Sequence, residues 1–528
     1  MPTEPTPLDL TADVVVAGGG PAGAWAALAA AQSGADVLLL DKGYCGTSGP
    51  TASGGTGVWY VRPDPEDREK AMASREALGG HLADRRWAAR VLDQTYENMH
   101  RLGTEARYPF PVVDGEPYRR GVQGPEYMRR MRSWIRRAGV RILDHSPVLE
   151  LLTDPSGAVA GVRGHRRQHD MAYRVRAGAV VLATGGCAFL SKALGCDVDT
   201  GDGALYAAEV GAELSGMEFS NAYGIAPAFA SVTKTAYYNF ATFFRADGSL
   251  LAGASSQGGR AVIAAELMRT GTVLCSLDQA TPEQQAGMRL GQPNFFLPFD
   301  RLGIDPFTDR FPVTLLLEGT VRGTGGIRIT DDECATTVPG LYAAGDAATR
   351  ELICGGFTGG GSHNAAWAMS SGTWAGRGAA RFAATLGGGS ARRRLVATGE
   401  AGLRSGAEVA EEAILSVREQ VHPYEKNYLR HGDRLRPALA ELDGAWSGLR
   451  GGAAVRGAAA IRSRQAAAMV AHARWMYTSA LARTESRGMA RREEFPELDP
   501  AQHHRLTVGG LDRIWVRPEA GARQAVAS

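Results

Sequence analysis

Residues 14–43 read VVVAGGGPAGAWAALAAAQSGADVLLLDKG, the order expected for a strand, a glycine turn, a helix and a second strand. Gly18, Gly20 and Gly23 give the spacing G-x-G-x-x-G between the first strand and the helix. In such a turn the first glycine permits the tight bend and the second lets the backbone approach a pyrophosphate. The third lets the helix lie close to the sheet. The helix N-terminus adds N–H donors and a positive dipole end for phosphates. The stretch therefore predicts a dinucleotide-binding βαβ unit.

The second strand of this unit ends in Asp41, which is followed by Lys42. An acidic residue at this position accepts hydrogen bonds from ribose hydroxyls in dinucleotide-binding folds. We therefore expect both residues at the cofactor. The alternative for the whole stretch is a glycine-rich turn of some other α/β domain.

Composition narrows the class of protein. The chain has 528 residues, enough for two or three domains, and a formal net charge of +2, which does not indicate a nucleic-acid partner. Its six cysteines form no C-x-x-C pair, which argues against an iron–sulfur cluster or metal site within this chain. Scattered cysteines indicate reduced thiols and a cytoplasmic location. No run of about 18 apolar residues is present, so we expect no membrane span.

The strand and glycine patterns divide the chain into segments. The βαβ rhythm fills residues 1–220 and returns in 320–390, where GLYAAGD occupies residues 340–346. Residues 221–319 lack this rhythm and carry many aromatic side chains, so they predict an inserted α+β domain. Residues 391–528 are mainly helical in pattern. The predicted fold class is α/β, with a Rossmann-like domain, an inserted capping domain and a helical C-terminal domain.

Several ordered motifs resemble one known family. They are Thr51-Ala52-Ser53-Gly54-Gly55, ATGG at 183–186, TGDG at 200–203, Met217-Glu218, GLYAAGD, AGRGAA at 375–380 and ESRGMARREEFP at 485–496. In these motifs the chain resembles the flavoprotein subunits of succinate dehydrogenase, fumarate reductase, L-aspartate oxidase and adenylylsulfate reductase. The resemblance implies FAD, a capping domain that moves over it, and hydride transfer at flavin N5.

The resemblance also implies where FAD lies. Its pyrophosphate is expected at the glycine turn, its isoalloxazine beside residues 51–55, and its ribityl chain at Asp346. The full expected set is Gly18, Gly20, Gly23, Asp41, Lys42, Thr51, Ala52, Ser53, Gly54, Gly55, Val148, Thr184, Gly185, Asp202, Gly345, Asp346 and Asn364. A surface turn is the alternative for Asp346, and an ordinary loop for residues 51–55.

One departure concerns attachment of the cofactor. Membrane-bound members of the family carry FAD on a histidine that precedes the T-x-x-x-G-G segment. The corresponding positions here are Ser48, Gly49 and Pro50. We therefore expect non-covalent FAD.

A second departure concerns the substrate. Of the two histidines and two arginines that hold dicarboxylates in the family, only one arginine is found intact, as Arg260. The histidine positions fall at Tyr223 and Val321, so succinate and fumarate are not expected as substrates. Arg260, Tyr223, Arg322 and His363 are the candidate catalytic residues. Their alternatives are ordinary structural roles in ion pairs, packing or helix capping.

The leading functional hypothesis is an FAD-dependent oxidoreductase that transfers hydride between flavin N5 and a small, anionic organic substrate. One alternative is the flavoprotein subunit of a two-component reductase, fed by a separate ferredoxin-like iron–sulfur protein. Another is an FAD-binding electron carrier without substrate chemistry. The sequence leaves the substrate, the reaction direction and the oligomeric state open.

Overall fold

The largest layer of the computed structural model is an eight-stranded sheet. The structure describes residues 7–233, 236–357, 361–387, 389–405 and 407–519. The sheet has the order β18-β8-β9-β10-β1-β2-β7, and β17 pairs with β10. Its strands are β1 (Leu8–Ala17), β2 (Val37–Leu40), β7 (Arg141–Leu143), β8 (Val148–Thr153), β9 (Val159–Arg166), β10 (Met171–Leu182), β17 (Leu341–Ala343) and β18 (Val396–Ala397). Strands β1, β2, β7, β10 and β17 are parallel, whereas β8, β9 and β18 pair antiparallel.

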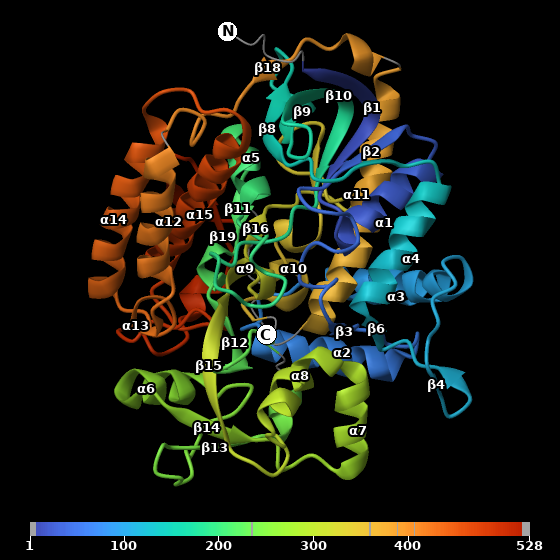
Figure 1. Ribbon diagram of the computed structural model, residues 1–528. Coiled ribbons are helices and arrows are strands. Elements are labelled where there is room, and N and C mark those ends of the chain that lie inside the picture. Colours follow the sequence, from blue (N-terminus) through green and yellow to red (C-terminus); the bar gives the residue numbers. More distant parts are fainter. Residues whose placement is uncertain (1–6, 234–235, 358–360, 388, 406, 520–528) are drawn as a thin grey trace.

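Helices α1 (Pro21–Gln32) and α11 (Gly361–Thr385) lie together beside this sheet, with α3 (Arg85–Thr104) and α4 (Gly124–Arg137) next to them (Figure 1). Two glycines of α11 set the distance between α1 and α11. A Cβ on Gly372 would lie 2.4 Å from the Ala22 carbonyl oxygen, and a Cβ on Gly376 would lie 2.1 Å from that of Ala26. The two helices therefore touch backbone to backbone.

A second sheet, with all pairs antiparallel, lies below the first in Figure 1. It has the order β12-β15-β14-β13, and three helices accompany it. These elements are β12 (Ala222–Pro227), β13 (Thr242–Phe244), α6 (Arg260–Thr270), β14 (Val273–Ser276), α7 (Pro282–Gly291), α8 (Pro293–Leu302) and β15 (Phe311–Glu318). Phe299 packs edge-on against Phe311, and Phe295 packs against Phe299, which joins α8 to the sheet. The predicted inserted range, 221–319, contains the whole sheet, and its boundaries stay a prediction.

The C-terminal part is built on α12 (Ala407–Val421), α14 (Gly432–Arg450) and α15 (Gly457–Ala482), which pack on one another. The predicted α/β fold with a helical C-terminal region is confirmed. The chain then adds β19 (Leu506–Gly509) and β20 (Trp515–Pro518) to a sheet with β11 (Leu214–Ser215) and β16 (Gly326–Ile327). Within the described ranges, no helix has the length and apolar character needed to cross a membrane.

The remaining α-helices and strands are β3 (Gly55–Gly57), α2 (Pro65–Leu78), β4 (Val112–Val113), β5 (Glu116–Pro117), β6 (Gly121–Gln123), α5 (Asp202–Glu209), α9 (Gly319–Arg322), α10 (Glu351–Cys354) and α13 (Tyr424–Asn427).

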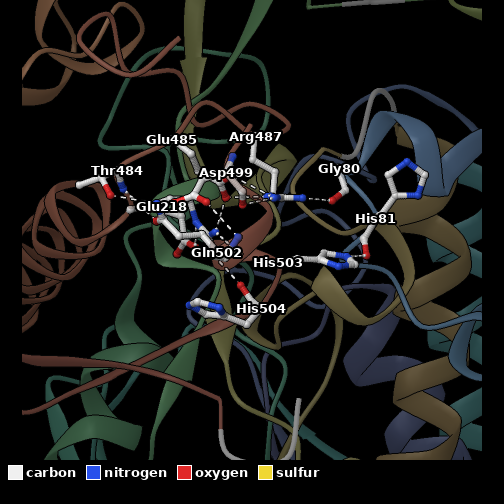
Figure 2. A network of polar contacts seen from close by, with 12 residues as sticks. Gly80, His81, Glu218, Thr484, Glu485, Arg487, Asp499, Gln502, His503 and His504 are labelled. Atoms are coloured by element: carbon white, nitrogen blue, oxygen red, sulfur yellow. Dashed lines mark hydrogen bonds and ion pairs between the residues drawn. The ribbon is translucent and has the colours of Figure 1, made fainter. Parts of the chain in front are cut away.

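A buried network of charges ties the C-terminal segment to the first domain (Figure 2). Arg483 pairs with Glu218 at 2.8 Å and with Glu485 at 2.7 Å, and Arg487 pairs with Glu485 at 2.6 Å. Arg487 also donates a hydrogen bond to the carbonyl of Gly80, which precedes α3. Because all three ion pairs are buried, removal of one partner would leave an uncompensated charge.

The α1–α11 contact predicts the effect of adding one methyl group. Gly376→Ala places a Cβ against a backbone carbonyl that cannot move aside, so we expect a loss of about 2 kcal/mol of unfolding free energy. Gly444→Ala is the matched control, because it lies within α14 with no atom within 4 Å of the new Cβ. That variant should gain up to about 1 kcal/mol from helix propensity. Denaturant unfolding measures both. Equal effects of the two variants would contradict the role given to the contact.

Candidate functional site

One pocket lies at the carboxyl ends of the parallel strands, where ligands bind in open α/β sheets. We call it the central pocket. Its walls come from the glycine turn and the start of α1 (residues 17–22), the segment after β2 (40–42 and 48–51), Thr56, Pro147–Val148, the end of β10 (183–185), Val198, Asp199, Asp202, Tyr206, Val321–Arg322, Gly345–Asp346 and four residues at the start of α11, Gly361, Asn364, Ala365 and Ala368. The close α1–α11 contact is what brings the first and last of these segments to one cavity.

The glycine turn is shaped as the fingerprint predicts. Gly18 has φ +108°, and a Cβ there would lie 2.2 Å from the Ala183 carbonyl oxygen. A Cβ on Gly23 would lie 1.8 Å from the Gly18 carbonyl oxygen, so only glycine lets α1 sit this close. Gly20, by contrast, has no atom within 4 Å of the position of a Cβ and borders the pocket. This open cradle at a helix N-terminus fits a pyrophosphate.

Asp41 and Lys42 hold the segment after β2 in place. The Asp41 carboxylate accepts hydrogen bonds from the backbone N–H of Gly19 and of Gly43, both at 2.7 Å, and from the Ser48 hydroxyl at 3.0 Å. Lys42 Nζ lies 2.8 Å from the Asp202 carboxylate. Asp41 thus connects the glycine turn to the strand end, and Lys42 connects that strand end to α5.

Three buried polar atoms of the pocket wall have no hydrogen-bond partner among the described residues. They are the hydroxyl oxygen of Thr184, the side-chain oxygen of Asn364 and Oδ2 of Asp199. The Asn364 side-chain nitrogen donates to the Val321 carbonyl at 2.6 Å, which fixes the orientation of the amide. Buried polar groups are normally paired. Their lack of a partner fits a polar ligand such as FAD, whose hydroxyls and ring edge offer donors and acceptors.

The Asp346 carboxylate forms an ion pair with Arg350. Burial raises the pKa of Asp346, and the neighbouring Arg350 and Arg322 act to lower it. Arg350 is itself fully buried and donates to the Thr320 carbonyl at 2.8 Å. The pair therefore offers one carboxyl group to the pocket while Arg350 stays anchored to the backbone.

Most of the expected cofactor residues line the central pocket. They are Gly18, Gly20, Asp41, Lys42, Thr51, Val148, Thr184, Gly185, Asp202, Gly345, Asp346 and Asn364. The structure leaves Gly23, Ala52, Ser53, Gly54 and Gly55 outside the lining. Gly54 and Gly55 instead contact Gln292, between α7 and α8. A Cβ on Gly54 would lie 2.5 Å from the Gln292 side-chain nitrogen, and the Gly55 N–H donates to its oxygen at 3.1 Å.

The four candidate catalytic residues differ in their position relative to the central pocket. Arg322 lines the central pocket, with Nε 3.8 Å from the Glu318 carboxylate. Burial acts to lower the pKa of Arg322, but Glu318 and Asp346 hold it above the ordinary value. Arg260 begins α6 and donates to the Tyr223 and Ser256 carbonyls, both at 2.7 Å. Burial lowers the pKa of Arg260.

His363 and Tyr223 do not line the central pocket. His363 is buried beside it, with its ring centroid 4.7 Å from that of Trp59. The Tyr223 hydroxyl donates to the carbonyls of Val421, at 2.9 Å, and His422, at 3.1 Å. The structure therefore gives Tyr223 a packing position against the C-terminal helices. Packing was the alternative to a catalytic role for this residue.

Sequence reasoning missed two acidic residues at this site. Glu318 accepts a hydrogen bond from Thr233 at 2.6 Å and faces Arg322. Asp199 lines the central pocket. Glu318 lies in no motif. Asp199 directly precedes the TGDG motif, so its position was a weak indication that it lies at the cofactor site.

The fold and the central pocket define a dinucleotide-binding α/β protein. Comparison with known families refines this class. Residues 13–237 match the family model described as FAD dependent oxidoreductase, and residues 429–517 match that described as fumarate reductase flavoprotein C-term.

Individual proteins are similar to this chain in sequence. An L-aspartate oxidase of Streptomyces coelicolor is 29% identical over 374 residues, which cover 64% of this chain and 63% of that protein. An L-aspartate oxidase of Mycobacterium tuberculosis is 28% identical over 545 residues, covering 95% of this chain and 96% of the other. A urocanate reductase of Eggerthella lenta is 30% identical over 258 residues, 42% of each chain.

Solved structures share the fold. E. coli quinol fumarate reductase FrdA superposes with a TM-score of 0.79 at 20% identity over 97% of each chain. The adenylylsulfate reductase of Archaeoglobus fulgidus superposes with a TM-score of 0.74 at 17% identity over 98% of each chain. The chain is similar to the FAD-dependent succinate dehydrogenase/fumarate reductase flavoprotein family in both its N-terminal and its C-terminal parts, and it is an FAD-dependent oxidoreductase.

The pocket wall predicts how FAD is held. Ser48, Gly49 and Pro50 line the central pocket at the positions where the family's histidine tether would lie, and none carries an imidazole. Acid precipitation of the purified protein should therefore leave FAD in the supernatant, as measured by absorbance and chromatography. Flavin retained on the protein pellet would contradict non-covalent binding.

Proposed function

We propose that this protein oxidises or reduces a small anionic organic substrate by hydride transfer between the substrate and FAD. The observation that carries the proposal is Arg322, a guanidinium in the wall of the central pocket. Arginine binds carboxylates and similar anions through two parallel hydrogen bonds, and the arrangement is strongest where water is excluded. Bound FAD supplies the two-electron carrier.

Neighbouring charges support an anion site. Glu318 holds Arg322 from the side of β15, and Arg260 lies within electrostatic range of both. Arg260 belongs to the second sheet's helices, whereas Arg322 borders the FAD pocket. An anion between them would therefore draw the inserted domain toward the flavin and help exclude water.

The positions of the family's histidines argue against succinate or fumarate. Tyr223 uses its hydroxyl on backbone carbonyls, and Val321 is a buried apolar residue. Neither supplies an imidazole for dicarboxylate binding. His363 is the candidate proton donor or acceptor of the proposal, because it is buried next to Asn364 at the pocket.

A surface groove supports the alternative of a separate electron partner. It shares Ser48, Gly49 and Val198 with the central pocket and is bordered by the exposed cations Arg167 and Lys192. A small acidic iron–sulfur protein would complement these positive charges. Bound in this groove, it would lie against the residues that separate the groove from the FAD pocket. In this alternative the chain would still bind its substrate at Arg322.

Arg260 provides the test of the proposed function. An anaerobic screen of organic acids and sulfur compounds for flavin bleaching identifies the substrate, and turnover is then measured on it. We expect Arg260→Ala to retain FAD but to lose on the order of 10²-fold in kcat, as when a transition-state donor is removed. Arg260→Lys should also be impaired, because it lacks the planar fork.

Arg269→Ala is the matched control for Arg260. Arg269 lies on the same helix, is exposed, and pairs with Glu266 of that helix at 2.6 Å. Its variant should turn over as wild type does. Activity of Arg260→Ala within a few-fold of wild type, with FAD content and thermal unfolding unchanged, would assign Arg260 a structural role.

A further inference from the structure

Asp199 stands out among the acidic residues of the central pocket. It is 4% exposed, and its backbone is fixed by hydrogen bonds from its own N–H to the Cys196 carbonyl, at 2.9 Å, and from the Ala188 N–H to its carbonyl, at 2.8 Å. Its carboxyl group sits over Gly185, where an added Cβ would lie 2.3 Å from Oδ1. Asp199 is therefore a rigid part of the wall.

The other three carboxyl groups of this wall have donors. Asp41 accepts from Gly19 and Ser48, Asp202 pairs with Lys42, and Asp346 pairs with Arg350. Asp199 Oδ2, in contrast, is buried and has no hydrogen-bond partner among the described residues. A buried ionised oxygen without a donor is costly, whereas a protonated one needs only an acceptor.

The surrounding charges favour the neutral form. Burial raises the pKa of Asp199 well above its usual range, and Asp346, Asp202 and Asp41 add to this effect. Lys42 opposes it but is already paired with Asp202. The neighbouring thiols of Cys187 and Cys196 stay neutral, because burial raises the pKa of each. Bound FAD adds two phosphate charges to the same pocket, which favours protonation further.

We propose that Asp199 is a neutral carboxylic acid in the FAD-bound protein and that its Oδ2–H donates a hydrogen bond to an oxygen of the cofactor. The proton comes from solvent, and no bond of FAD is broken. This inference concerns the cofactor and is independent of the proposed substrate. Thr184 and Asn364, the other unpaired polar groups of the wall, lack a titratable proton, so Asp199 alone of the three makes FAD binding sensitive to pH.

The sign of the pH effect follows from linkage. Because only the protonated form donates to FAD, FAD must raise the pKa of Asp199 above its value in the free protein. Affinity is then constant at pH values below the pKa in the free protein. Above it, affinity falls by up to tenfold per pH unit, until the pKa in the complex is passed. An amide at this position keeps a neutral donor but cannot ionise.

The experiment measures the FAD dissociation constant from pH 6 to pH 10 by quenching of flavin fluorescence. The wild-type protein should bind FAD more weakly at alkaline pH. Asp199→Asn should bind within about threefold of wild type at pH 6 and lose the alkaline fall, whereas Asp199→Ala should bind on the order of tenfold more weakly at pH 6. Asp197→Asn is the matched control, since Asp197 lies on the same loop but is exposed, and it should follow wild type.

Two results would overturn the proposal. One is a pH profile of Asp199→Asn that coincides with that of wild type. The other is a loss of affinity in Asp199→Asn as large as that in Asp199→Ala. Should Asp199→Ala fail to fold, an infrared difference spectrum of the FAD-bound proteins decides whether Asp199 is protonated. Wild type minus Asp199→Asn must then show the C=O stretching band of a protonated carboxylic acid, and its absence would refute the assignment.

Discussion

The close contact between α1 and α11 determines where the walls of the FAD pocket lie. Gly372 and Gly376 allow these helices to meet at the backbone of Ala22 and Ala26. The contact places the start of α11, with Asn364, beside the glycine turn, although more than 340 residues separate them in sequence. Hydrogen bonds from Trp367 to the Gly345 carbonyl, at 3.1 Å, and from the Gly345 N–H to Ser371, at 3.0 Å, attach the Asp346 segment to the same helix. One packing contact therefore assembles three walls of the FAD pocket.

Charge is distributed around this pocket in two ways. On the FAD side three acidic residues have donors, with Asp41 held by backbone N–H groups, Asp202 by Lys42 and Asp346 by Arg350, whereas Asp199 Oδ2 has no hydrogen-bond partner among the described residues. Toward the inserted domain, Arg322 borders the pocket and Glu318 keeps it charged. An anionic cofactor and an anionic substrate can share such a site because each faces a different set of groups. The buried network around Glu485 holds the C-terminal segment against the first domain (Figure 2).

The sequence predicts local structure here better than contacts between distant segments. The turn at Gly18–Gly23, the strands around it and the fold class were predictable, because glycine spacing and apolar runs are local signals. Gly54 and Gly55 also had to be small, but their neighbour is Gln292 of the inserted domain, which no local pattern indicates. Glu318 and Asp199 were missed for the same reason. Their roles come from burial and from partners that only the folded chain supplies.

The proposed function requires an anion to bind beside the flavin at Arg322. A titration of the FAD-loaded protein with malonate and, separately, with neutral malonamide, followed by flavin absorbance, measures this binding. We expect a saturable spectral shift with malonate, none with malonamide, and at least about tenfold weaker malonate binding in Arg322→Ala, as expected for loss of a charged hydrogen bond. Equal binding of malonate and malonamide, or unchanged malonate affinity in Arg322→Ala with FAD fully bound, would contradict it.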